Sequence, residues 1–164
     1  YRISEIRYLE APAIQLKNGD LLVTKDGTIG KLAIVSECPE KAVLNSGIFV
    51  TRCKNKAYIT KYMYYILLSK SFDFYVGLQS TGSTIKHLYQ ETFVNFIYIL
   101  PSVETQKVLI EFLDKQTDEI EKLVRKSHKQ VRNLKQAKQS LISEAVTGKI
   151  DLRNWEIIEE GEIQ

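Results

Sequence analysis

Apolar residues recur at alternating three- and four-residue steps through the C-terminal part of the chain. This spacing places them at the a and d positions of a heptad repeat, on one side of an α-helix, over roughly six repeats. Neither glycine nor proline occurs between Ser102 and Thr147, as is typical of one long helix. The pattern predicts a coiled-coil-type helix over 103–146 that pairs with another helix.

The seam of this helix has apolar and polar members. The apolar residues expected to form the pairing interface are Ile110, Leu113, Ile120, Val124, Val131, Leu134 and Leu141. Polar interruptions, which cost stability and can fix the register of a pair, fall at Gln106, Thr117, Ser127 and Lys138. At about 1.5 Å per residue the helix is roughly 65 Å long.

Residues at both ends suit a helix boundary. The Ser102 hydroxyl is expected to accept a hydrogen bond from a free backbone N–H of the first turn. Glu104 is favoured there by the helix dipole. Gly148 is free to adopt the left-handed conformation that closes a last turn.

Short apolar runs separated by turns replace this pattern before Pro101. They predict strands at 21–23, 32–35, 47–51 and 97–100 and a helix at 59–69. The apolar face of that helix is expected at Tyr62, Tyr65, Ile66 and Leu68. The fold class is therefore α+β. A mixed α/β domain over 1–101 is followed by the long helix over 102–148 and a tail over 149–164.

The net charge of +3 is unevenly distributed. From Glu104 to Glu121 there are six acidic residues and two lysines, whereas from Lys122 to Lys138 there are seven basic residues and no acid. This segregation suits the helix dipole. It also favours an antiparallel partner of similar sequence, because each acidic half would lie beside a basic half. A mildly basic body with an acidic tail is compatible with nucleic acid.

Signatures of catalysis, metal binding and membranes are absent from the sequence. There is no [DE]-x-K, GxGxxG or HExxH, and 27–31 is not a phosphate loop, because that would need glycine at Lys25 and Ser or Thr at Leu32. Cys38 and Cys53 stand outside any CxxC or Cys/His cluster, so free thiols in a reducing cytoplasm are expected. No apolar run approaches the roughly 18 residues of a membrane span. We expect a non-enzyme that needs no cofactor or metal.

Two polar loops with cations, at 24–28 and 79–87, are the candidates for DNA contact. Such loops can present backbone N–H groups, hydroxyls and a lysine to phosphates and base edges, although they are equally compatible with ordinary surface turns. The candidate residues are Lys25, Thr28, Ser83, Thr84, Lys86 and His87. Tyr62, Tyr64 and Tyr65 are expected in the core rather than stacked on bases.

Several runs resemble the specificity subunits of type I restriction–modification systems. These runs are PSVETQ at 101–106, FLD at 112–114 and SLISEAVTGKID at 140–151. GDLL at 19–22, GTIGK at 27–31 and TGST at 81–84 resemble the target-recognition domain of the same family. That family commonly reads Pro-Pro-Leu-x-Glu-Gln at the helix start, so Ser102 and Thr105 depart from it, though both suit a helix N-terminus.

The resemblance implies a non-catalytic DNA-recognition subunit that reads half of a bipartite site. It implies double-stranded DNA and methyltransferase subunits as partners, and the restriction (nuclease/translocase) subunit indirectly. A second specificity half, in a homodimer or within one longer chain, would complete it. Because the chain begins at Tyr1, we expect a fragment or a missing N-terminal segment.

Two other interpretations remain at this point. One is a protein-interaction adaptor whose coiled coil is the working surface and which does not bind DNA. The other is an enzyme fragment without its catalytic half. Steep salt dependence of duplex binding would favour the DNA-recognition hypothesis, because phosphate contacts release counterions. Neither the DNA sequence recognised nor the spacer length follows from the chain.

Overall fold

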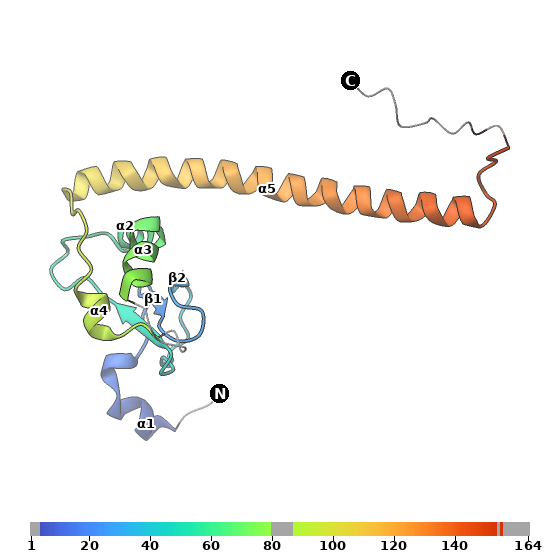
Figure 1. Cartoon of the computed structure of the whole chain (residues 1–164). Coiled ribbons are helices and arrows are strands. Elements are labelled where there is room, and N and C mark those ends of the chain that lie inside the picture. Colours follow the sequence, from blue (N-terminus) through green and yellow to red (C-terminus); the bar gives the residue numbers. More distant parts are fainter. Residues whose placement is uncertain (1–3, 80–86, 154, 156–164) are drawn as a thin grey trace. The chain divides into compact units, whose positions relative to one another are not determined.

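The computed structural model describes residues 4–79, 87–153 and 155 (Figure 1). The chain divides into two compact units, 1–113 and 114–164. The first unit, called here the recognition unit, contains a small sheet, four α-helices and the first turns of the long helix α5. The second consists of the remainder of α5 and the tail.

The sheet has three antiparallel strands, β1 (Leu21–Thr24), β2 (Leu32–Ile34) and β3 (Ile48–Thr51), in the order β2-β1-β3. In the central strand, Leu21 and Val23 alternate with less buried residues and are fully buried themselves. This alternation is expected for a strand with one face on the core. The first three predicted strands are thus confirmed, with ends that differ by a residue.

The helices of the recognition unit before α5 are α1 (Glu5–Glu10), α2 (Thr60–Leu68), α3 (Lys70–Gln79) and α4 (Gln90–Val94), with a 3₁₀ turn η1 at Pro12–Ile14. Helix α2 packs on β2, and α3 packs on α2. The core cluster consists of Leu21, Val23, Met63, Leu67, Phe72 and Leu88. Phe72 is fully buried and its ring meets those of Phe93 and Phe96 edge to face, at centroid distances of 6.0 and 5.1 Å.

The predicted helix at 59–69 is confirmed as α2, but its predicted buried face is only partly right. Tyr62, Met63 and Leu67 are buried, whereas Leu68 is 53% exposed. The helix is apolar around most of its circumference, so its sequence pattern does not select one face. Packing against β2 and α3 makes that selection.

The predicted strand at 97–100 is wrong. The segment has no ladder partner among the described residues, and Ile97 and Ile99 are 91% and 82% exposed. A side chain holds it instead, because the Tyr62 hydroxyl donates a hydrogen bond to the Ile99 carbonyl oxygen over 2.8 Å. The segment pairs with neither edge strand of the sheet, β2 or β3.

The long helix α5 spans Val103–Val146, as predicted (Figure 1). The Thr105 N–H donates to the Ser102 hydroxyl over 3.3 Å, so the expected N-cap is present. At the other end Gly148 has φ +72°. The Gly148 N–H donates to Ala145 and the Lys149 N–H to Glu144, which is the Schellman arrangement.

Gln106, predicted as a polar interruption of the seam, is instead an anchor of the recognition unit. Its side chain is fully buried. The amide nitrogen donates to the carbonyls of Ala57 at 3.0 Å and Pro101 at 2.9 Å, and the amide oxygen accepts from the Ile59 N–H at 2.8 Å. These contacts fasten the first turn of α5 to the segment that leads into α2.

Candidate nucleic-acid interface

The turn after β1 and the segment at His87 lie together, although they are 61 residues apart in the chain. Asp26 and His87 form an antiparallel bridge, and the Leu88 N–H donates to the Lys25 carbonyl over 2.8 Å. The Asp26 carboxylate also contacts Nδ1 of His87. Parts of the two predicted loops therefore form one surface. Leu88 is buried in the core, and this places its neighbour His87 beside the turn after β1.

His87 is held in a defined orientation on this surface. Its ring is half-buried and meets the Tyr89 ring edge to face at 4.6 Å between centroids. Because Asp26 occupies Nδ1, the Nε2 atom is the ring nitrogen available to an incoming acceptor or donor. Asp26 is therefore a local hydrogen-bonding partner of His87.

Lys25 lines a groove along the outer edge of β3, called here the β3 groove. The groove has a volume of about 690 Å³ and carries three cations, Lys25, Arg52 and Lys54, and no acidic residue. The Lys25 ammonium lies 5.0 Å above the centre of the Phe49 ring, a cation–π contact that restrains the side chain. Polar groups able to meet base edges also line it, on Asn45, Ser46 and Gln90.

Arg52 is the fixed cation of the β3 groove. Its Nε and Nη2 donate to the two carboxylate oxygens of Asp20, each over 2.6 Å, and Nη2 also contacts the Gln15 carbonyl. Burial raises the pKa of Asp20, but the hydrogen bonds from Arg52 and the Lys17 N–H outweigh it, so this pKa lies below its usual value. The partner carboxylate in turn raises the pKa of Arg52.

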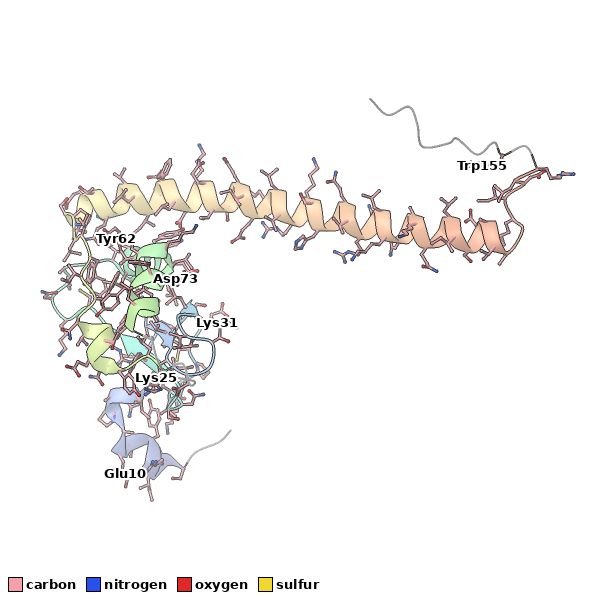
Figure 2. All side chains as sticks on the ribbon, in the orientation of Figure 1. Glu10, Lys25, Lys31, Tyr62, Asp73 and Trp155 are labelled. Atoms are coloured by element: carbon pink, nitrogen blue, oxygen red, sulfur yellow. The ribbon has the colours of Figure 1, made fainter. Side chains whose placement is uncertain are left out.

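Thr28 lines a different groove, about 500 Å³ in volume, between the β1–β2 turn and α3. Asp73 and Gly77 of α3 form its other side. Figure 2 shows Lys25 and Asp73 in different parts of the recognition unit. The backbones of Lys25 and His87 are close in space, because their neighbours Asp26 and Leu88 pair with His87 and Lys25, respectively. Thr28 lies on another surface. The candidates Ser83, Thr84 and Lys86 lie outside the described residues.

Residues 6–131 match the family described as the type I restriction modification DNA specificity domain. The chain belongs to this family. The match begins in α1 and continues into α5, so the specificity domain here includes both the recognition unit and most of the long helix.

Two curated specificity subunits are similar to this specificity-domain chain. One is the type I restriction enzyme MjaVIII specificity subunit of Methanocaldococcus jannaschii, 25% identical over 147 residues, covering 87% of this chain and 34% of that protein. The other is the type I restriction enzyme EcoBI specificity subunit of Escherichia coli, 24% identical over 139 residues, covering 85% of this chain and 28% of that protein. The chain thus spans about a third of the length of these relatives.

The α5 seam of the specificity domain is largely uncovered. Ile110 and Leu113 are half-buried. The other five predicted pairing residues have exposed fractions of 48 to 70%: Ile120, Val124, Val131, Leu134 and Leu141. A row of large apolar side chains on one side of a helix is a usual mark of a protein interface.

Two features of this domain were missed by sequence reasoning. The Asp20–Arg52 ion pair joins residues 32 positions apart, so only the β1–β3 pairing brings them together. Asn45, Lys54 and Gln90 belong to no recognisable sequence motif, and the β3 groove brings them together from separate segments.

Among the described residues no cluster could hold a metal ion, and no helix has the length and apolar character of a membrane span.

Proposed function

We propose that this specificity domain is a non-catalytic DNA-recognition module that reads half of a bipartite site, while its helix spaces that half from a second one and docks methyltransferase subunits. The observation that carries the proposal is the family match, which runs unbroken from the recognition unit into α5 over residues 6–131. The restriction subunit would join through the methyltransferase subunits.

The β3 groove and the adjoining His87 surface are the proposed DNA-reading region. Lys25 and Lys54 supply charge for phosphate contacts, which position a protein on DNA without reading sequence. Asn45 and Gln90 carry amides of the kind that form paired hydrogen bonds with adenine in the major groove. Because Arg52 is paired with Asp20, the attraction of the groove for a polyanion rests on Lys25 and Lys54, and its amides add a means of discrimination.

The exposed seam supports pairing with a second specificity half. Burying a large aliphatic side chain contributes about 1.5–3 kcal/mol relative to leaving it in water. Five such residues lie on the uncovered side of α5. A second copy of this chain carries the same seam, so pairing of two copies would bury these apolar side chains. An equivalent helix in a longer chain would bury them in the same way.

Heptad positions beside the seam support an antiparallel arrangement. Asp114 and Glu121 occupy e positions, as do His128 and Lys135. In an antiparallel pair e positions face each other, so the acidic pair would oppose the basic pair. In a parallel pair e positions face g positions, which between 109 and 137 are Leu, Gln and Ala only. Only the antiparallel arrangement offers opposite charges along this edge.

Duplex binding by the whole chain tests the proposed DNA function. We expect Lys25→Gln with Lys54→Gln to weaken binding and to lower the salt slope by up to about 0.9 for each phosphate that is no longer bound. The control pair Lys17→Gln with Lys70→Gln removes the same charge at exposed sites outside the groove. A wild-type chain that binds no duplex, or binds without salt dependence, would favour the adaptor interpretation.

A further inference from the structure

The charged residues of the basic half of α5 lie mainly on the side opposite the seam. With the seam at a and d, five of the seven cations between Lys122 and Lys138 fall at b, c and f. These five form what we call the outer cationic face: Lys122, Arg125, Lys126, Lys129 and Arg132. All five are exposed.

Ion pairs neutralise only the N-terminal end of this face. Arg125 contacts Glu121 at 3.1 Å, and Lys122 lies 4.0 Å from Asp118. Lys126, Lys129 and Arg132 have no acidic residue within four positions on either side, so the usual i,i+4 partners of a helix are missing there. Arg125, Lys129 and Arg132 also border a shallow hollow of about 510 Å³ with His128 and Asn133.

We propose that the outer cationic face binds the phosphate backbone of the DNA between the two half-sites. This inference rests on the proposed function. Pairing through the seam would cover a and d and leave b, c and f in solvent, so the face stays available in the paired helix. Its five cations extend over about 15 Å of helix, and duplex DNA carries one negative charge per ~1.7 Å of its axis.

Duplex DNA is the occupant that the charge pattern favours. Its potential is negative at every position, so cations at irregular b, c and f positions find phosphates without a matched surface. An acidic protein face would need carboxylates in register with each of them. The face would therefore add sequence-independent affinity, whereas the recognition unit would supply the discrimination.

The test compares the wild type with a variant in the salt dependence of binding to a duplex of about 45 base pairs, about 150 Å long and of arbitrary sequence. The triple variant Lys126→Gln, Lys129→Gln, Arg132→Gln keeps good helix formers at exposed positions, so the fold should be unchanged, which far-UV circular dichroism checks. If three phosphates are no longer bound, the slope of log Kobs against log salt should fall by up to about 2.7. Between about 50 and about 200 mM salt, the ratio of wild-type to variant affinity should narrow by up to roughly 40-fold.

The matched control is Lys17→Gln, Lys70→Gln, Lys149→Gln, which removes the same charge at exposed positions outside the proposed face. Its slope should remain near that of the wild type. If the triple variant and the control have equal slopes while the wild type binds duplex, the outer cationic face does not contact DNA and this inference is wrong. If the wild type binds no duplex, the proposed function itself is wrong and the inference is overturned with it.

Discussion

Gln106 illustrates how a polar side chain can hold two segments together from inside the fold. Burying an amide is unfavourable unless its hydrogen-bonding groups find partners. Here the nitrogen has two carbonyl acceptors and the oxygen has one N–H donor. Because those partners come from the segment before α2 and from Pro101, Gln106 ties the first turn of α5 to both.

Replacing Gln106 by Ala should therefore destabilise the recognition unit by about 1–3 kcal/mol, since it leaves buried backbone groups without partners. Urea denaturation followed by circular dichroism measures the change. Gln136→Ala, at an exposed position of the same helix, should change the unfolding free energy by less than about 0.5 kcal/mol. Equal effects of the two substitutions would contradict the anchoring role.

The Asp20–Arg52 pair predicts a dependence of stability on pH. Because the folded-state pKa of Asp20 lies below its usual value, the pair stabilises the fold above the ordinary aspartate pKa of about 3.9. That contribution is lost as the pH falls through the lower folded-state pKa. Asp20→Asn should cost about 1–3 kcal/mol near neutral pH and flatten the acid limb of the stability curve.

Urea unfolding at a series of pH values below neutral measures this change. Glu10→Gln removes an exposed carboxylate at the end of α1 and serves as the control. A wild-type curve that falls no more steeply with acid than that of Asp20→Asn would show that the pair is not the source of the dependence.

At the scale of elements, the notable feature of α5 is an apolar seam that is mostly exposed to solvent. Its caps and its freedom from Gly and Pro make it a continuous helix, but most of its apolar seam is in solvent. In a folded protein, an amphipathic helix gains most of its stability from packing its apolar face. The exposed seam is the reason for proposing a partner helix, and the charges at the e positions favour one that runs the opposite way.

A single cysteine tests that orientation. If two copies pair antiparallel, Ile110→Cys alone should give little disulfide-linked dimer, because position 110 of one helix lies near position 141 of the other. Ile110→Cys combined with Leu141→Cys should cross-link efficiently, since the two Cα atoms would approach the roughly 4.4–6.8 Å that a disulfide spans. Non-reducing electrophoresis after mild oxidation reads the result, with wild type controlling for Cys38 and Cys53.

Efficient cross-linking of the single Ile110→Cys variant would instead place like positions together and rule out the antiparallel pair. A chain that stays monomeric by sedimentation at high concentration would rule out pairing between two copies.

At the scale of the whole molecule, the proposed function makes α5 a spacer. Two DNA readers on a rigid support must meet half-sites at a separation set by that support. Deleting one heptad, 124–130, keeps the seam in phase and shortens the helix by about 10.5 Å. At ~34 Å per turn of B-DNA, the spacer should shorten by about three base pairs, while the bases recognised stay the same.

Methylation-site sequencing in a host that expresses the complete system with this variant measures both quantities. An altered set of recognised bases with an unchanged spacer would contradict the spacer role of α5.

Local rules predicted part of the fold well. The heptad steps, the Ser102 cap and Gly148 located α5 at its observed ends. The turn at Gly19 precedes β1, and the turn at Gly27 separates β1 from β2. The helices α1, α3 and α4 were not predicted, because their apolar residues are few or lack one clear face. The segment 97–100 looked like a strand because its composition favours one, and composition carries no information about an available partner edge.

The sequence by itself determined the long helix, the α+β class and the family, because these depend on spacing and on runs of residues that are contiguous in the chain. Only the tertiary structure decided that Gln106 is buried, that Asp20 pairs with Arg52 and that Lys25 and Thr28 line separate grooves. Each of these depends on which distant segments share a surface. That is set by strand pairing and core packing across tens of residues, for which no local pattern is sufficient.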